Sequence, residues 1–409
     1  MIIRARIVVT MDGPPIENGA VVVSGDRIAS VGKFPDVAKT YSDTEVVDLG
    51  ERALVPGLIN AHCHLDYTCL RGAISRQESF TAWIRAINEE KAKLSPQDYV
   101  ASINDGFLEA KRFGTTTIAN LTAFPELVSQ IETPLRTWWF AELIDVRDPD
   151  QAHKIVDRAV EGLKSEEHWG LAPHAPFTAS ANLYRSCEEI ARRKNILLTT
   201  HLAESREERE MFQDARGPLY AFLQEIGRDM GDCGNSTPVE HFLGRGGSPN
   251  RPRAIEDNRS YLLVHLNEFV GGDFEVLRKS ANEFSIVHCP RSHEYFGHSP
   301  FQFEKLRDAA FNICLGTDSL ASNNDLSLFA EMRAFQKEFS NIAPEKIFEM
   351  VTLNPARALR QETTLAKIRR GSVADLIAIP SARSNSIFEQ IIAFDRAVVW
   401  SMLSGRILA

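Results

Sequence analysis

Residues 53–64 read ALVPGLINAHCH, an apolar run that ends in two histidines separated by one cysteine. Successive side chains of a β-strand point to opposite faces, so His62 and His64 share one face and Cys63 lies on the other. Two imidazoles aimed at one point can hold one metal ion. A His-x-His pair also arises by chance, so the pair indicates a metal site only if the rest of the chain supplies further ligands.

Apolar runs of the same kind recur through the middle of the chain and alternate with charged, amphipathic stretches. The runs occupy residues 54–61, 115–121, 135–143, 169–174, 196–201, 260–266, 284–289 and 311–316. Eight strands that alternate with helices predict an α/β fold, a (β/α)8 barrel of the TIM type. A doubly wound parallel sheet would give a similar alternation, so periodicity alone leaves the count of eight open.

The two ends of the chain have a different pattern from the middle. Residues 1–54 carry short β-rich runs separated by turns, and residues 363–409 repeat that style. We therefore expect the two ends to form one small β-sandwich beside a hydrolase barrel at residues 55–362. The longest interruption, residues 227–259, is polar and follows the fifth strand and its helix, where an active-site lid would lie.

Composition narrows the class of protein and its partners. The 409 residues are 44% hydrophobic and 25% charged, and the formal net charge is −9. This acidic balance argues against a nucleic-acid partner, and without a run of about 18 apolar residues no membrane span is predicted. The N-terminus lacks a signal peptide's apolar core, and six scattered cysteines form no C-x-x-C pair, so a cytoplasmic protein with free thiols is expected. The expected partner is a small-molecule substrate, and a homo-oligomer stays open.

Polar residues gather at the carboxyl ends of the predicted strands, where the catalytic side chains of an α/β barrel lie. Six of the eleven histidines end such runs, and one glutamate and one aspartate join them. A hydrogen-bonded core histidine explains any one of these positions, but it does not explain the whole set. The set consists of His62, His64, His174, His201, Glu204, His265, His288 and Asp318.

Part of this set resembles the metal site of the amidohydrolase superfamily of metal-dependent hydrolases. The residues in that order and spacing are His62, His64, His201, His265 and Asp318. Residues 56–64 look like the family's opening motif, and residues 352–359 and 371–376 are similar to its closing motifs. The resemblance therefore covers essentially the whole chain, including the divided β-sandwich.

Within the superfamily, three short motifs resemble the branch that deaminates adenosine-like nucleosides and related aminated rings. They are HAP at 174–176, HLAE at 201–204 and GTDS at 316–319. Residues 316–333 are similar to aminodeoxyfutalosine deaminases of menaquinone biosynthesis, and also to adenosylhomocysteine/methylthioadenosine deaminases.

The resemblance implies one divalent metal ion, held by His62, His64, His201 and Asp318. Three neutral imidazoles and one carboxylate make a nitrogen-rich site suited to Zn²⁺, or alternatively to Fe²⁺, with a position left for water. Binuclear members of the superfamily bridge two ions with a modified lysine near the fourth strand, whereas residues 169–178 contain no lysine. One ion is therefore the expected number.

The expected catalytic residues are Glu204, His265 and Asp318. A metal-bound water ionises near neutral pH. Asp318 can ligate the metal while hydrogen-bonding this water, and His265 can take its proton or orient it. Glu204 can protonate a ring nitrogen and later deliver a proton to the departing ammonia. This shuttle favours a hydrolytic deaminase in which a metal-bound hydroxide attacks an adenine-type nucleoside.

Two other functions stay open at this point. An amidohydrolase that acts on guanine, a triazine or a cyclic amide needs the same activated water, but less of the proton shuttle that Glu204 offers. A non-catalytic scaffold of the same fold is expected to have lost metal ligands, and here the full set is present.

The expected substrate contacts are His174, Trp83, Ser319 and Arg291. The resemblance implies a nucleoside contact at His174, whereas Trp83 either lines the pocket or anchors an amphipathic helix. The family's pattern after the seventh strand usually ends in Ser-Asn, but residues 288–293 read HCPRSH. Arg291 in this segment is expected to pair with a substrate carboxylate, as a carboxyphenyl-bearing nucleoside would require, or else to be a surface charge.

Overall fold

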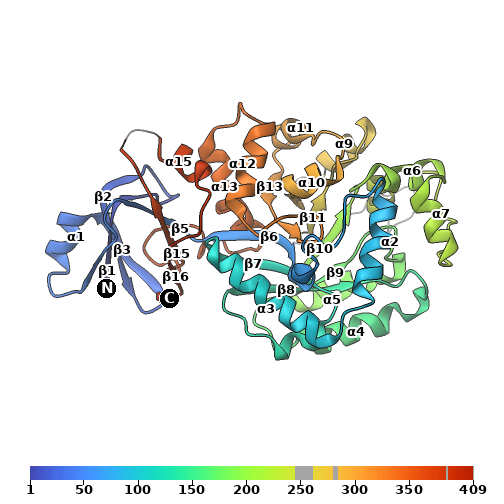
Figure 1. The fold of residues 1–409 in the computed structure, drawn as a ribbon, viewed down its shortest axis with the longest axis horizontal. Coiled ribbons are helices and arrows are strands. Elements are labelled where there is room, and N and C mark those ends of the chain that lie inside the picture. Colours follow the sequence, from blue (N-terminus) through green and yellow to red (C-terminus); the bar gives the residue numbers. More distant parts are fainter. Residues whose placement is uncertain (245–260, 280–283, 384–385, 409) are drawn as a thin grey trace.

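The computed structural model describes residues 1–244, 261–279, 284–383 and 386–408. Its larger part is a parallel sheet with flanking helices, and its smaller part is a mixed sheet that holds both ends of the chain (Figure 1). The two sheets join at Gly57, where β5 (Arg52–Pro56) of the smaller sheet runs directly into β6 (Leu58–His64) of the larger one.

The larger sheet is the predicted barrel, and its strands pair in parallel in the order of the chain. All residues of β6 are buried, as is typical of a parallel strand covered on both faces. The strands that follow are β7 (Thr115–Thr122), β8 (Arg136–Leu143), β9 (Trp169–Pro173), β10 (Leu197–Leu202), β11 (Tyr261–His265), β12 (Phe284–His288), β13 (Asn312–Leu315) and the short β14 (Asp318–Ser319).

The sheet closes because the segment after β13 bends back to the first strand. The backbone N–H of Thr317 donates to the carbonyl of His62 at 3.0 Å, and Asp318 in β14 pairs with Cys63. A side chain at Gly316 would place its Cβ 2.7 Å from the carbonyl oxygen of His62, so this approach requires glycine. Closure therefore brings Asp318 beside the two histidines of β6.

Helices cover the outside of the barrel and its mouth (Figure 1). Serine hydroxyls cap several of their N-termini by accepting a backbone N–H, for example at Ser79, Ser180 and Ser327. The helices of this part are α2 (Phe80–Lys91), α3 (Pro96–Arg112), α4 (Ala152–Leu163), α5 (Ala181–Lys194), α6 (Arg206–Asp214), α7 (Pro218–Glu225), α8 (Pro238–Gly244), α9 (Gly271–Arg278), α10 (Pro290–Phe296), α11 (Phe303–Asp308), α12 (Leu328–Glu338), α13 (Pro344–Glu349) and α14 (Leu353–Ala358), with 3-10 turns η1 (Leu65–Leu70), η2 (Pro125–Gln130) and η3 (Pro149–Gln151).

The two ends of the chain meet in the smaller sheet, as predicted, and they form one mixed sheet of eight strands. N-terminal β5 and C-terminal β15 are antiparallel neighbours, so the two halves share their main-chain hydrogen bonds. The other elements are β1 (Ile2–Val8), β2 (Ile16–Ser24), β3 (Arg27–Lys33), α1 (Phe34–Thr40), β4 (Val46–Asp48), β15 (Leu376–Pro380), α15 (Ile387–Ala393), β16 (Trp400–Leu403) and β17 (Arg406–Leu408).

Two further expectations can be compared with the described residues. No helix within them is both long and apolar enough to cross a membrane. The six cysteines are free thiols, and all except Cys69 are buried.

Candidate active site

A cavity of about 290 Å³ opens at the carboxyl ends of the barrel strands. Its base contains polar side chains from the ends of six strands, and its outer walls are largely apolar side chains of α2 and α7. The polar residues at the base include His64, His201, Glu204, His265 and Asp318. The barrel thus brings together residues that are far apart in the sequence.

Three histidines at the base form a cluster with metal-binding geometry. One ring nitrogen from each of His62, His64 and His201 lies within 4.8 Å of those of the other two. The Nε2 atoms of His64 and His201 are 3.3 Å apart. The ring nitrogens of His62 are buried and have no hydrogen-bond partner among the described residues. Buried polar atoms normally have partners, so this arrangement is what a ligand set for an ion requires.

The protonation of His201 also fits metal binding. Its Nδ1 donates to the main-chain carbonyl of His174 at 2.9 Å, which leaves Nε2 without a hydrogen. Burial, together with the neighbouring imidazoles of His174 and His62, lowers the pKa of His201 to about 3. Burial and the adjacent imidazoles likewise hold the pKa of His64 well below its usual range. Neutral imidazole is the form that binds a divalent ion, so the donor set fits one.

Asp318 completes the cluster from the closing segment of the barrel. Its Oδ1 lies 3.6 Å from Nε2 of His62 and 3.9 Å from Nε2 of His64. The hydroxyl of Ser292 donates to the other oxygen, Oδ2, at 2.5 Å. Burial alone would raise the pKa of Asp318, but His62 and His265 beside it hold that pKa well below its usual range. The carboxyl group therefore faces the histidines in its ionised form.

Glu204 and His265 face each other next to this cluster, with 3.5 Å between Oε1 and Nε2. Burial, and then the negative charges of Asp318 and Glu208, raise the pKa of Glu204 well above its usual range. Burial lowers the pKa of His265. A carboxyl group with a raised pKa, beside an imidazole with a lowered pKa, is suited to general acid–base catalysis.

The geometry is matched by the comparison with protein families. The sequence model of the amidohydrolase family matches residues 53–408. The chain belongs to the amidohydrolase family. It is therefore a hydrolase that acts on carbon–nitrogen bonds, in a family that depends on metal ions, as the sequence predicted.

Several known proteins are similar to this amidohydrolase over nearly its full length. The 5-methylthioadenosine/S-adenosylhomocysteine deaminase of Thermococcus kodakarensis is 29% identical over 376 residues, which cover 88% of this chain and 80% of the relative. The aminofutalosine deaminase of Helicobacter pylori, solved with methylthio-coformycin, has a TM-score of 0.87 at 21% identity and covers 100% of both chains. An adenosine deaminase of Xanthomonas campestris with bound zinc has a TM-score of 0.79 at 22% identity, covering 99% of this chain and 92% of that one. At these identities the two structures show the fold.

Glu142 is a cavity residue that the sequence-based prediction omitted. It is the next-to-last residue of β8, so the rule applied to the other strand ends would have found it. Its Oε1 lies 3.8 Å from Nδ1 of His64 and 4.0 Å from Nε2 of His174. Glu142, His174 and His201 also form a group of metal-binding size. That group shares His201 with the first cluster, so within the described residues the two groups adjoin each other.

Three of the four expected substrate contacts line the cavity, and Arg291 is the exception. His174, Trp83 and Ser319 are among the lining residues. Arg291, at the start of α10, instead pairs with Asp325 at 2.6 Å and lies 3.9 Å from the buried carboxylate of Glu331. Its charge is already paired with the carboxylate of Asp325 behind the site. The structure therefore does not support Arg291 as a contact for a substrate carboxylate.

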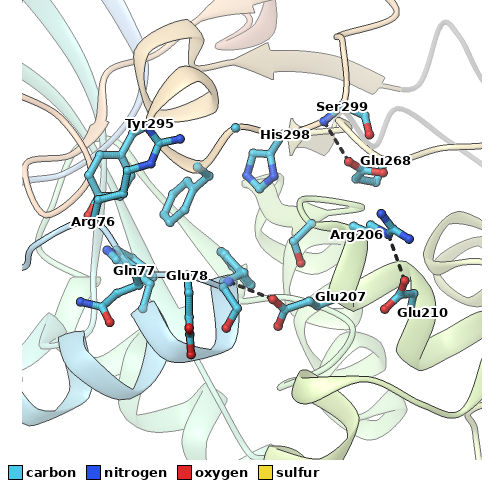
Figure 2. Close-up of a pocket in the computed structure, with 16 residues that line it drawn as sticks. Arg76, Gln77, Glu78, Arg206, Glu207, Glu210, Glu268, Tyr295, His298 and Ser299 are labelled. Atoms are coloured by element: carbon cyan, nitrogen blue, oxygen red, sulfur yellow. Dashed lines mark hydrogen bonds and ion pairs between the residues drawn. The ribbon is translucent and has the colours of Figure 1, made fainter.

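A second cavity of about 370 Å³ adjoins the first (Figure 2). Both are lined by Phe80 and Trp83, which pack with Phe296 as an aromatic wall. The carboxylate of Glu207 accepts the backbone N–H of Phe80 at 2.9 Å, so α6 holds the N-terminus of α2. Helix α6 thus anchors α2, which covers the catalytic cavity together with α7.

The predicted lid at 227–259 lies only partly within the described residues. None of its described residues, 227–244, lines the catalytic cavity. Val239 and Phe242 of α8 are fully buried in the main core, so this helix packs against the barrel. Residues 245–259 lie outside the described residues.

Proposed function

We propose that this amidohydrolase removes the amino group of an adenine-type nucleoside as ammonia. The observation that carries the proposal is the pair Glu204 and His265, which flanks the metal-ligand cluster with 3.5 Å between the two side chains. Deamination of an adenine ring needs a proton at the ring nitrogen and another at the departing amine. A buried carboxyl group with a raised pKa is suited to supply the first of these protons.

A divalent ion held by His62, His64, His201 and Asp318 supplies Lewis-acid activation of the attacking water. Glu204 donates its proton to the ring nitrogen next to the amine-bearing carbon. His265 takes a proton from the water as its oxygen bonds to that carbon. When the carbon–nitrogen bond breaks, Glu204 recovers a proton from the new hydroxyl group. His265, and not Glu204 as the sequence suggested, then passes its proton to the leaving amino group, which departs as ammonia. Both side chains are then ready for another turnover.

The outer part of the catalytic cavity, away from the histidine cluster, supports a substrate with an extended 5′ group. Apolar side chains of α2, α7 and the segment after β8 form its walls, among them Ile87, Ile144 and Phe222. Two cations, Lys91 and Arg147, also line it. An apolar slot with cations suits a thioether or aryl group that ends in a carboxylate. Adenosylhomocysteine-like and aminodeoxyfutalosine-like nucleosides both have this chemistry, and the latter would assign the enzyme to menaquinone biosynthesis.

The test is ammonia release by the zinc-loaded protein from a panel of candidate substrates. The panel contains adenosine, 5′-deoxyadenosine, methylthioadenosine, adenosylhomocysteine, aminodeoxyfutalosine, guanine, a chlorotriazine and a cyclic amide. We expect turnover of adenine nucleosides, with the highest kcat/KM for those that carry an extended 5′ group. Turnover of guanine, the triazine or the cyclic amide alone would support the competing function, and no turnover of any compound would support a scaffold.

The metal is tested separately, because the ligand set suits both Zn²⁺ and Fe²⁺. Elemental analysis of protein purified without added metal is expected to find one divalent ion per chain, and we propose zinc. Two ions at full occupancy would instead indicate that Glu142 and His174 bind a second one.

A further inference from the structure

Two consecutive residues of α10 are connected by hydrogen bonds to acidic residues of the active site, one to the side chain of Asp318 and one to the backbone of Glu204. Ser292 donates to Asp318, as described above. Nδ1 of His293 lies 3.0 Å from Oδ1 of Asn267, and the side-chain amide of Asn267 donates to the main-chain carbonyl of Glu204 at 3.1 Å. The described residues that line the catalytic cavity include neither His293 nor Asn267. The histidine is also the point where the HCPRSH segment departs from the family's usual Ser-Asn.

The direction of these hydrogen bonds follows from the carbonyl of Glu204, which can only accept. The NH2 group of Asn267 must therefore face that carbonyl, so its Oδ1 faces His293 and also needs a donor. Nδ1 of His293 must then carry the hydrogen, which leaves Nε2 without one. Burial lowers the pKa of His293 to about 4, so the ring is neutral near pH 7 and holds this single proton. The contact thus selects one tautomer.

The backbone at Glu204 needs such support because the preceding residue is strained. Ala203 has φ +50°, a left-handed conformation that residues other than glycine rarely adopt. Its carbonyl accepts the backbone N–H groups of Asn267 and Glu268 at 3.0 and 2.9 Å. The carboxylate of Glu208 accepts the N–H of Glu204 at 2.8 Å. The Asn267 side chain adds the bond at the Glu204 carbonyl, and that side chain is oriented by His293.

We propose that His293 is a positioning residue that sets the orientation of Glu204 through Asn267. The proposal rests on the proposed function, because it gives a role only if Glu204 transfers protons. A simple packing role is the competing explanation, since the ring of His293 also lies beside His288 and His298, with centroid distances of 5.2 and 5.6 Å. A packing role depends on ring volume, whereas positioning depends on the donor at Nδ1.

Three substitutions of His293 separate the two roles. His293→Phe keeps the ring but removes the donor. His293→Asn keeps a donor, because its Nδ2 is attached to Cγ as Nδ1 is in histidine, whereas His293→Gln moves the amide one bond further out. We expect His293→Phe and His293→Gln to lower kcat by about ten- to a hundredfold, the effect of a misplaced catalytic group. KM and zinc content are expected to stay within twofold, and His293→Asn is expected to retain most of the wild-type kcat.

His298→Phe is the matched control, because it makes the same change in the neighbouring ring, whose Nε2 has no hydrogen-bond partner within the described chain. We expect its kcat to stay within twofold of wild type. An equal loss in His298→Phe, or full activity in His293→Phe, would overturn positioning and leave packing. Coupling to Asn267 gives an independent check: His293→Phe with Asn267→Ala is expected to be no slower than Asn267→Ala alone. Additive losses would contradict action through Asn267.

A measurement that needs no substrate distinguishes this inference from the proposed function. In protein labelled with 15N at the histidine rings, the signals lost in His293→Phe belong to His293. We expect them to report hydrogen on Nδ1 and none on Nε2 at pH 7. A hydrogen on Nε2 would overturn the inference even if the enzyme deaminates nucleosides. If the tautomer is as expected but no nucleoside is deaminated, the proposed function fails while the contact to Asn267 stands.

Discussion

Residues with unfavourable backbone conformations gather around the reacting groups. Ala203, His265, Leu266 and Asp318 all have φ between +50° and +79° and are not glycines. Each such conformation costs of order 1–3 kcal/mol and persists only where surrounding contacts hold it. Here the bonds from Ser292, Glu208 and Asn267 provide those contacts. Asp318 and Glu204, which lie in or next to these residues, both line the catalytic cavity.

Glu204→Gln tests the proton shuttle directly. Glutamine keeps the shape of the side chain but cannot donate and recover a proton in the same way. General acid–base catalysis contributes about 10²–10⁴-fold, so we expect kcat to fall by at least that factor. Zinc content and the unfolding temperature are expected to stay near those of wild type. A variant with bound zinc and nearly normal kcat would rule out the proposed role of Glu204.

Arg147→Ala tests how the outer cavity recognises a carboxylate. Arg147 is exposed and makes no ion pair with any described residue, so it can approach a charged substrate. An exposed ion pair contributes up to about 1 kcal/mol, so we expect KM for a carboxylated nucleoside to rise about two- to fivefold. KM for 5′-deoxyadenosine should not change, and Arg192→Ala on α5 serves as a charge-matched control. Equal effects on both nucleosides would mean that Arg147 does not bind the carboxylate.

The strands of the barrel could be predicted because each is a compact apolar run. The run at 284–289, for example, is β12 at Phe284–His288. The covering of the cavity could not be predicted in the same way, because α2 and α7 are joined by Arg85 and Glu225, 140 positions apart. Such a contact depends on tertiary packing and leaves no local pattern. For the same reason the sequence revealed a cation at Arg291 but not its ion pair with Asp325.

Glu331 lies where α12 packs against α10, close to Arg291; this contact between the two helices is called the junction below. It is fully buried, and its two oxygens accept from the backbone N–H of Arg291 and the side chain of Asn323. Asn323 also donates to the carbonyl of Thr317 at 2.8 Å, next to Asp318. Burial raises the pKa of Glu331 to about 8, although Arg291 partly opposes this. The junction therefore supports the closing segment and holds a proton at neutral pH.

This proton makes stability depend on pH. The folded state binds it up to about pH 8, whereas the unfolded chain releases it near the ordinary glutamate value, so stability falls as pH rises through that window. We expect the unfolding temperature of chelator-treated protein to fall as the pH rises toward about 8, and this contribution to level off above that value. Glu331→Gln should flatten this dependence, and Glu345→Gln on α13 should not. Parallel curves for wild type and Glu331→Gln would contradict the assignment.

In the whole molecule, the pairing of β14 with β6 closes the barrel and, at the same place, brings Asp318 to the histidines of β6. β6 leaves the smaller sheet, forms the first barrel strand and carries His62 and His64. Asp318 lies in β14, the last strand of the larger sheet, and pairs beside β6. An ion bound there would link the first, fifth and eighth strands. Metal binding is thus expected to stabilise the closed barrel as well as serve the reaction.

Zinc should therefore raise the unfolding temperature of chelator-treated protein. A ligand that binds only the folded state adds about 2.7 kcal/mol when its free concentration is a hundredfold above Kd. The increase should grow with free zinc and shrink in His64→Ala and Asp318→Asn, which remove ligands from the two strands that meet at closure. His153→Gln, on α4, should respond as wild type does. An undiminished zinc response in both ligand variants would mean that zinc binds elsewhere, because a site built across the closing strands cannot lose either side and keep its affinity.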